Sequence, residues 1–173
     1  LCEEGILLLG KFSYPPVQRV FVSPMRRCLE TAGILFPGTE KEEEVLLKEC
    51  DFGIFENKNY QELSGNPEYQ AWIDSSGTLP FPEGESQEMF QKRCVRGFAR
   101  CVEQCLKDGL HTAALVVHGG TIMSILGACA DADRSYFDWQ VKNAQGYEVL
   151  VEEKKWRESQ KIQVAGKIYT GRI

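Results

Sequence analysis

The sequence predicts an α/β fold in which strands alternate with helices along the chain. Arg19–Ser23 is a short run of β-branched and aromatic residues, and a helical segment at Met25–Phe36 follows it. A second unit of this kind joins the apolar run Ala113–Val117 to a helix that ends near Cys129. Such alternation is typical of a sheet covered by helices on both faces. The 173 residues suit a single domain over 1–173, because no repeat, low-complexity run or long linker divides them.

The composition is that of an ordinary globular protein and argues against two classes of partner. Apolar residues make up 43% of the chain, charged residues 26%, and the net charge is −5. Nucleic acids and anionic membranes require a basic surface, so we expect neither as a partner. A small phosphorylated substrate needs only a few local cations and stays possible. No apolar run approaches the ~18–20 residues of a membrane span, and none has the pattern of a signal peptide.

The seven cysteines are odd in number and scattered, without a Cys-x-x-Cys pair. Because the chain has only two histidines, it offers poor material for a zinc site, and we expect no metal. Cys94, Cys101 and Cys105 share a helical stripe with Phe90 and Phe98, which predicts buried free thiols. Free thiols favour a reducing compartment, so we expect a cytoplasmic protein.

The first part of the chain predicts a helix, a strand–turn–helix unit and a further strand. Cys2–Phe12 is a mostly apolar run that predicts a short helix. In the unit that follows, Ser23 is predicted as the N-cap of the helix at Met25–Phe36, with Pro24 as its first residue. Lys41–Leu47 begins charged and ends apolar, and predicts another strand.

The remaining elements are a loop, several helices and a hairpin. Lys48–Tyr60 predicts the loop, and Glu62–Gly65 and Pro67–Ser75 predict short helical pieces. Ser86 is placed to cap a long amphipathic helix that runs to about Leu106. A hairpin is predicted near the end of the chain, from the strand Tyr147–Glu152, the turn Glu153–Lys155 and the strand Trp156–Val164.

His118 stands where ligands bind in open α/β sheets. Ala113–Val117 has the composition of a strand buried on both faces, and His118-Gly119-Gly120-Thr121 joins it to the next helix. Ligands bind such sheets at the carboxyl ends of the strands. Glycines allow the backbone to approach a ligand, and the free N–H groups of a first helical turn favour an anion. The stretch therefore predicts a phosphate site that contains His118.

Three segments carry the remaining chemistry, and their order is informative. They are Ser23-Pro24-Met25-Arg26-Arg27-Cys28 with Glu30-Thr31-Ala32, Leu47-Lys48-Glu49-Cys50-Asp51-Phe52-Gly53 with Phe55-Glu56, and Val117-His118-Gly119-Gly120-Thr121. They resemble the Ser-Pro-Leu-x-Arg-Ala-x-x-Thr-Ala turn, the Leu-x-Glu-x-x-Phe-Gly-x-Trp-Glu loop and the Ser-His-Gly-Gly turn of the histidine phosphatase superfamily, also called phosphoglycerate mutase-like. Leu1–Gly5 and Phe81–Ser86 are similar to two further family segments, so the matches run along nearly the whole chain.

This resemblance implies a fold and a mechanism. The fold is a three-layer α/β/α sandwich with a mostly parallel central sheet. A histidine attacks a phosphomonoester, and water hydrolyses the resulting phosphohistidine, with no metal or other cofactor. Arg27 would hold the phosphoryl oxygens with its planar guanidinium, and His118 would hydrogen-bond the phosphoryl group without being the nucleophile. Gly119 would offer its backbone N–H to the same phosphate.

Glu49 matches the family's acidic residue, which protonates the leaving oxygen and later deprotonates water. The first task needs a protonated carboxyl, so we predict that the pKa of Glu49 is raised above the reference of ~4.3. Asp51, Glu56 and Glu85 are acidic rivals, and Glu85 is the second candidate. The possible substrate pocket also includes Trp72.

Four other residues have a structural interpretation, either alone or beside a functional one. Trp72 with Tyr69 forms either part of a substrate lid or an ordinary packed aromatic pair. Arg26 has no family counterpart and is expected to be exposed. His111 precedes the strand without a following glycine, which predicts a surface histidine.

The resemblance breaks at the nucleophile. The family's signature is an Arg-His-Gly at the end of a first, central strand, and no Arg-His-Gly occurs in this sequence. We therefore expect the nucleophilic histidine in a segment that precedes Leu1. We also expect the folded protein to contain that strand, because losing it would leave ladder groups of its neighbours unpaired. A chain that truly began at Leu1 should be catalytically inactive.

The sequence thus favours a metal-independent phosphomonoesterase that acts on a small phosphorylated metabolite. The short length favours a phosphatase such as the α-ribazole phosphatase branch over a phosphoglycerate mutase, which stays an alternative. A second alternative is a non-catalytic family member that binds a phosphorylated ligand or a protein partner. A dinucleotide enzyme is disfavoured, because no Gly-x-Gly-x-x-Gly follows a strand. The sequence does not determine the oligomeric state.

Overall fold

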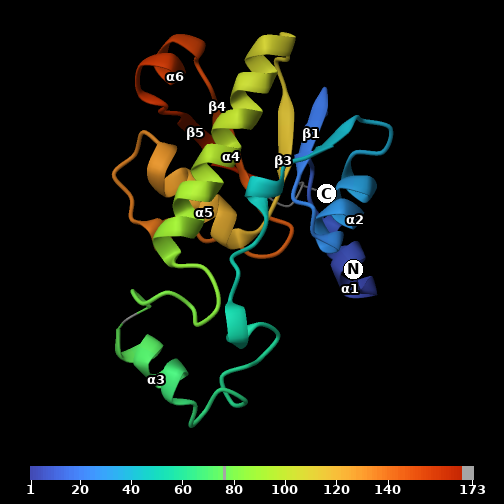
Figure 1. The fold of residues 1–173 in the computed structure, drawn as a ribbon. Helices are drawn as coiled ribbons and strands as arrows, with labels where there is room; N and C mark the ends of the chain where they lie inside the picture. The colour runs from blue at the N-terminus through green and yellow to red at the C-terminus, as the bar shows by residue number, and fades with distance from the viewer. Residues whose placement is uncertain (76, 169–173) are drawn as a thin grey trace. The chain divides into compact units, whose positions relative to one another are not determined.

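The computed structural model describes residues 1–75 and 77–168, and these alternate between helices and strands as an α/β chain does (Figure 1). The α-helices are α1 (Glu3–Leu9), α2 (Arg26–Leu35), α3 (Pro67–Asp74), α4 (Gln87–Asp108), α5 (Gly119–Cys129) and α6 (Glu153–Ser159). The strands are β1 (Arg19–Val22), β2 (Lys41–Glu43), β3 (Ala113–Val116), β4 (Tyr147–Leu150) and β5 (Gln163–Lys167). Short 3-10 turns are η1 (Val45–Leu47), η2 (Gly53–Phe55) and η3 (Tyr136–Trp139).

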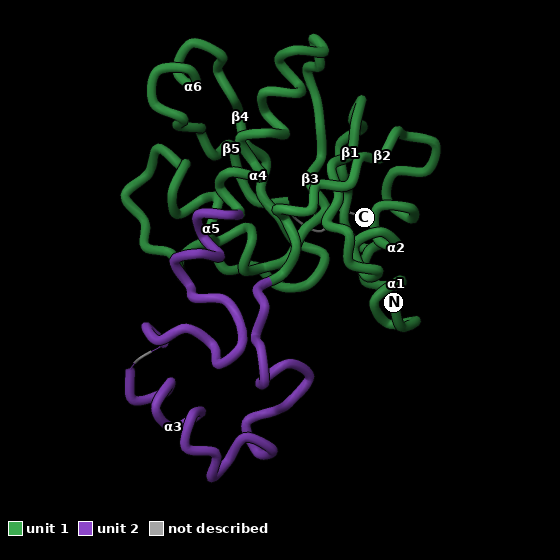
Figure 2. The backbone as a smooth tube through the Cα atoms, in the orientation of Figure 1, with its two compact units in different colours: residues 1–49, 94–173 green, residues 50–93 purple. Residues whose placement is uncertain are grey.

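The chain divides into two compact units, which Figure 2 distinguishes by colour. Unit 1 consists of Leu1–Glu49 and Cys94–Ile173, and unit 2 of Cys50–Arg93. Unit 1 holds the sheets, and the long helix α4 runs from unit 2 into unit 1. The expectation of a single domain over 1–173 stays a prediction.

A parallel sheet of unit 1 confirms the predicted fold class. Its strand order is β2-β1-β3, with both pairings parallel. Val20 lies opposite Lys41 on one side and Ala114 on the other. Because β1 is the middle strand, Val20, Phe21 and Val22 are at most 2% exposed.

Helix α2 covers one face of this sheet because its apolar residues recur every four positions. Cys28, Ala32 and Phe36 form a buried cluster with Val20 and Val22 of β1. The opposite side of the sheet faces α4 (Figure 1). Part of the predicted stripe on α4 is buried, since Cys94, Phe98 and Cys101 are at most 4% exposed, whereas Cys105 is only half-buried.

The hairpin predicted near the end of the chain is partly wrong. Strands β4 and β5 do form an antiparallel pair, but the predicted partner Trp156–Val164 and turn Glu153–Lys155 are replaced largely by helix α6. Trp156 explains the difference, because its ring is 1% exposed and packs edge-on against Phe98 at 5.5 Å. Burial of this ring on α4 outweighs the local alternation that indicated a strand.

Two other predicted elements differ from those in the structure. Lys41–Leu47 is a strand only as far as Glu43, because the side chain of Glu44 accepts a hydrogen bond from the Leu46 N–H at 3.0 Å and starts η1. Glu62–Gly65 is a turn and not a helix. By contrast Ser86 caps α4 as predicted, with its hydroxyl 3.1 Å from the Met89 N–H.

Strand β3 is not buried on both faces as its composition predicted. All four of its residues are half-buried, and among the strands that the structure describes it pairs only with β1. An edge strand has ladder groups without a neighbouring strand on one side, whatever its apolar content. Composition identified the strand, but its neighbours determine its burial.

Unit 2 is built around an aromatic cluster. The ring of Trp72 stacks on those of Tyr69 and Phe81, with centroids 6.4 and 5.1 Å apart. At the base of the cluster two loops meet through glycines: Gly53 has a φ of 54°, and a Cβ there would lie 2.0 Å from the Pro82 carbonyl oxygen. The loop at Gly53 and the segment Pro82–Gly84 are therefore packed closely against each other.

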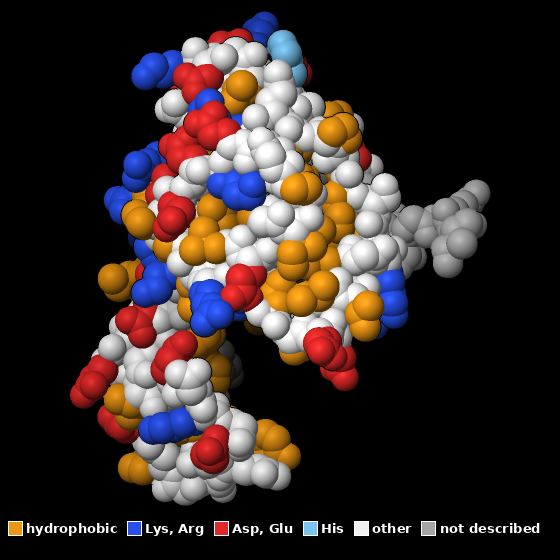
Figure 3. Space-filling model, turned by 90° about the vertical axis from the view of Figure 1, so that its right-hand side faces the viewer, with side chains coloured by type: hydrophobic (Ala, Val, Ile, Leu, Met, Phe, Trp, Pro, Cys, Tyr) orange, Lys and Arg blue, Asp and Glu red, His pale blue; other side chains and the backbone are white. Residues whose placement is uncertain are grey.

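The surface of unit 1 carries exposed apolar side chains on its first helices. Ile6 and Leu7 of α1 and Ile34 of α2 are 44–70% exposed. Hydrophobic side chains gather on the face shown in Figure 3, which is the side of α1 and α2. Within the described part of the chain, no helix is long and apolar enough to cross a membrane.

Candidate active site

The candidate site lies at the carboxyl ends of β1 and β3. Because the two strands are parallel, Ser23 and His118, which follow them, reach the same edge of the sheet. The Ser23 N–H donates to the Val116 carbonyl oxygen at 3.1 Å, so the ladder continues up to the site. His118 serves as the N-cap of α5 without a side-chain capping bond, which leaves its ring to interact elsewhere.

Arg27, Glu49 and His118 come together here, as the sequence analysis expected. The guanidinium Nη2 of Arg27 lies 3.0 Å from Nδ1 of His118. An Oε2 atom of Glu49 lies 3.6 Å from that Nη2 and 3.6 Å from the same Nδ1. Three elements therefore contribute to one cluster: the first turn of α2, the segment after η1, and the β3–α5 turn.

The three side chains of the cluster differ in how much of each is exposed to solvent. The His118 side chain is 3% exposed, that of Glu49 21%, and that of Arg27 50%. The imidazole is thus the fixed inner wall of the cluster, and the guanidinium faces solvent. An anion that arrives from solvent meets the cation first, which is the order expected for electrostatic capture.

Helix α5 supplies a second feature suited to an anion. Its first residues, Gly119 and Gly120, have backbone N–H groups without an intrahelical acceptor. Gly119 is exposed, and a Cβ added there would meet no heavy atom within 4 Å. The described packing does not require glycine at this position, so the open backbone is available to a ligand.

The structure adds two residues that sequence reasoning missed as site residues. Ser23 was predicted as the N-cap of α2, but the N-cap is Met25 and the helix begins at Arg26. The Ser23 hydroxyl instead lies 2.7 Å from Nε2 of His118, and its contact with the Met25 N–H is long, at 3.4 Å. The sequence signal that could have marked Ser23 as a site residue is its place as a polar residue at the end of a buried strand.

Cys28 is the second missed residue. Its Sγ lies 3.6 Å from Nε2 and 3.8 Å from Nδ1 of His118. Burial raises the pKa of the Cys28 thiol to about 11, although Arg27 and a hydrogen bond with Ser23 act in the opposite direction. The thiol therefore stays protonated at neutral pH and presents a neutral surface to the ring.

The other residues that the sequence singled out do not belong to the cluster of Arg27, Glu49 and His118. Glu85 and Trp72 belong to unit 2, so their assignment to a substrate pocket stays a prediction. There the Glu85 carboxylate forms a bidentate pair with Arg93 at 2.8 and 2.7 Å, and Trp72 is packed in the aromatic cluster. Arg26 is 91% exposed and pairs with Glu30, and His111 is exposed, as predicted for both.

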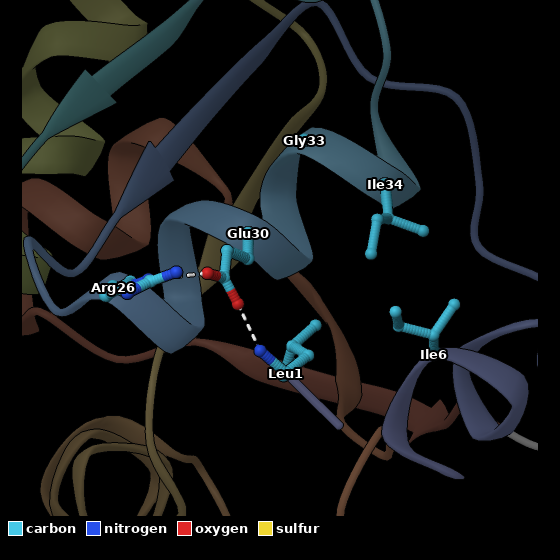
Figure 4. A pocket seen from close by; sticks show the side chains of 6 residues that line it. All are labelled: Leu1, Ile6, Arg26, Glu30, Gly33 and Ile34. Atoms are coloured by element: carbon cyan, nitrogen blue, oxygen red, sulfur yellow. Dashed lines mark hydrogen bonds and ion pairs between the residues drawn. The ribbon is translucent and has the colours of Figure 1, made fainter. Parts of the chain in front are cut away.

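A separate cavity of about 480 Å³ lies between α1 and α2 (Figure 4). It is lined by Leu1, Ile6, Arg26, Glu30, Gly33 and Ile34. Figure 4 shows the Glu30 carboxylate beside the Arg26 guanidinium, whose Nε donates to it at 2.7 Å. Arg27, Glu49 and His118 do not line this cavity. The cluster of these three side chains is therefore the better candidate for the active site.

Comparison with known proteins finds a matching family model and several similar structures. The model of the histidine phosphatase superfamily (branch 1) matches residues 7–161. An α-ribazole phosphatase from Shigella flexneri superposes with a TM-score of 0.76 at 17% identity, over 98% of this chain and 81% of that one. A phosphoglycerate mutase from Bacillus anthracis gives 0.69 at 19% identity, over 96% and 80%. Another from Thermus thermophilus gives 0.58 at 22%, over 98% and 82%. A comparison with curated proteins finds no match.

Proposed function

This chain belongs to the histidine phosphatase superfamily, and from that premise we propose that it hydrolyses a small phosphomonoester without a metal ion. The observation that carries the proposal is the convergence of Arg27, Glu49 and His118 within 3.0–3.6 Å at the carboxyl edge of a parallel sheet. A cation, a carboxyl group and an imidazole are the groups that phosphoryl transfer through a phosphohistidine requires.

In the proposed reaction a histidine nitrogen attacks phosphorus, and the bond from phosphorus to the leaving oxygen breaks. The protonated carboxyl of Glu49 gives its proton to that oxygen. The resulting Glu49 carboxylate then takes a proton from water, which attacks the phosphohistidine and releases phosphate. Arg27, His118 and the Gly119 N–H hold the phosphoryl oxygens while their charge changes.

The proposed nucleophile is a third histidine, in a segment that precedes Leu1. Of the two histidines in this sequence, His118 is held inside the cluster and His111 is exposed on the surface. The half-buried residues of β3 support the proposal, because another strand beside β3 would bury them and place its own carboxyl end at the site.

The proposed substrate is a small phosphorylated metabolite, and the proposed location is the cytoplasm. One structural neighbour is named as an α-ribazole phosphatase, which supports hydrolysis. Two others are named as phosphoglycerate mutases, so transfer between 2- and 3-phosphoglycerate is the second candidate. A coupled mutase assay beside a phosphate-release assay separates the two activities.

Turnover of p-nitrophenyl phosphate by the natural full-length protein tests the proposal. We expect turnover that a chelator leaves unchanged and vanadate blocks. Absence of turnover in the verified full-length protein would contradict hydrolysis and favour the non-catalytic alternative.

Two adjacent arginines provide a matched pair of variants. Arg27→Ala should reduce kcat/KM by about 10²–10³-fold, since it removes a donor to the developing phosphoryl charge. Arg26→Ala should leave kcat/KM near wild type, because that side chain is 91% exposed and pairs only with Glu30 among the described contacts. Equal losses in the two variants would argue that net charge, and not the cluster, matters.

A further inference from the structure

The proposed reaction assigns no role to the buried hydroxyl of Ser23. Ser23 is 0% exposed, and its Oγ lies 2.7 Å from Nε2 of His118, compared with 3.4 Å from the Met25 N–H. A hydroxyl can accept or donate a hydrogen bond, so this contact alone does not fix the position of the imidazole proton.

The contact on the other ring nitrogen does fix it. Nδ1 lies 3.0 Å from Nη2 of Arg27. A guanidinium has only donors, so a neutral imidazole must present a lone pair at Nδ1 and carry its proton on Nε2. The Ser23 oxygen is then the acceptor for the Nε2–H group.

We propose that Ser23 is a positioning residue that holds His118 as the Nε2–H tautomer and directs Nδ1 toward Arg27 and Glu49. This inference deepens the proposed function and rests on it for its catalytic consequence. A dianionic phosphoryl group only accepts hydrogen bonds, so His118 must also carry a proton on Nδ1 when it donates to that group. Ser23 accepts from Nε2–H in both protonation states, so the ring needs no reorientation when substrate binds.

The surroundings of the ring agree with this assignment. The ionisable groups in its described contacts are Arg27, Glu49 and Cys28. The first two lie on the Nδ1 side, where substrate charge would change. The Cys28 Sγ lies 3.6 Å from Nε2 and leaves the shorter contact to Ser23.

Imidazole NMR of the full-length protein tests the tautomer directly. The printed sequence contains two histidines, so ¹⁵N-histidine labelling gives few signals, and the exposed His111 serves as an internal reference. Above the pH at which His118 becomes neutral, we expect its ¹⁵N shifts to show the Nε2–H form as the dominant one. A dominant Nδ1–H form in the wild-type protein would overturn the proposal.

Variants at Ser23 separate positioning from packing. Ser23→Ala should lower the Nε2–H fraction of His118 and reduce kcat by about tenfold or more, since the imidazole is no longer held in one tautomer. Ser23→Thr keeps the hydroxyl and should restore both the tautomer and the pH profile of kcat. An unchanged tautomer in folded Ser23→Ala would refute the positioning role.

Ser124→Ala is the matched control. Ser124 is 2% exposed, and its hydroxyl donates to the Gly120 carbonyl oxygen at 2.8 Å without a described contact to His118. It removes a buried hydroxyl from the neighbouring helix and should leave the His118 tautomer unchanged. If the tautomer behaves as expected but the wild type shows no turnover, the proposed function fails while the assignment of the ring proton stands. If turnover is present and the tautomer does not respond to Ser23→Ala, only the present inference fails.

Discussion

At the scale of single residues, the site combines an exposed cation with a buried imidazole. Arg27 is half exposed, whereas His118 is almost fully buried and contacts the Ser23 hydroxyl and the Cys28 thiol. A long exposed cation costs little to reorganise when an anion arrives, and a buried imidazole keeps its direction. The cluster is therefore suited to capturing a phosphoryl group from solvent and holding it against a fixed wall.

Replacing Glu49 by glutamine tests the proton transfer. Glutamine keeps the size of the side chain and one acceptor oxygen but cannot give or take the proton. We expect kcat to fall by about 10²–10⁴-fold, while vanadate still binds because Arg27 and His118 are unchanged. Steady-state kinetics and a vanadate titration measure the two effects.

The control for this variant is Glu43→Gln, at an exposed glutamate of β2. It removes the same charge at a position outside the cluster, and its kcat should match that of the wild type. An unimpaired Glu49→Gln enzyme would mean that another carboxyl, with Glu85 the next candidate, carries the proton.

At the scale of elements, contact between α4 and η1 fixes the segment that leads to Glu49. Gly97 of α4 is buried against η1, and a Cβ there would lie 2.9 Å from Leu46 Cβ and 3.0 Å from Leu47 Cδ2. Leu47 is itself 0% exposed. A glycine in the middle of a long helix thus allows the approach of the segment from which Glu49 projects.

Gly97→Ala therefore has two opposing effects on the stability of the fold. Alanine improves helix propensity by about 1 kcal/mol, but overpacking a buried contact costs about 1–3 kcal/mol. We expect a net loss of stability and a lower kcat, because the 45–47 turn and Glu49 after it must shift. Urea unfolding and phosphatase kinetics report the two consequences.

Gly33→Ala in α2 is the matched control for that substitution. Gly33 is exposed, and a Cβ there would meet nothing within 4 Å. Only the propensity effect acts, so stability should rise by about 0.5–1 kcal/mol. If both variants were stabilised alike, close packing at Gly97 would not be limiting.

At the scale of the whole molecule, buried thiols make the fold sensitive to alkaline pH. Burial raises the pKa of Cys28 from 9.0 to about 11 and raises the pKa values of Cys101 and Cys129 in the same direction. In the unfolded chain these thiols ionise at their ordinary pKa, while the folded protein keeps them protonated. Their contribution to stability is therefore complete below about pH 9 and decreases as the pH rises toward about 11.

We expect the melting temperature to fall between about pH 7 and about pH 10, in reducing buffer, by more than it does in the Cys28→Ala variant. The variant removes one of the thiols that must stay protonated. Thermal melts of both proteins across this range measure the difference. Parallel curves would mean that Cys28 does not contribute to the pH dependence.

Much of the fold and the core of the site could be predicted from the sequence because they depend on local patterns. The β-branched run Arg19–Ser23 and the apolar run Ala113–Val117 mark strands whatever surrounds them. The residues that follow two parallel strands reach one edge of the sheet, and the family resemblance pointed to Arg27 and His118 as the two that meet there.

The parts that escaped prediction depend on contacts between distant segments. Trp156 lies in a helix because its ring packs on Phe98, 58 residues earlier by numbering, and no local window contains that information. Ser23 looked like a helix cap, since the serine–proline order is common there. Its hydroxyl interacts instead with an imidazole 95 positions away.

The sequence by itself determined the α/β class, most of the strands and helices, and the family, because periodicity and motif spacing can be read along the chain. Only the tertiary structure decided that β3 is half-buried, that Cys28 lies against His118, and that Ser23 contacts the imidazole. Burial and hydrogen-bond partners are set by whichever segments the fold brings into contact, and a linear chain does not contain those distances.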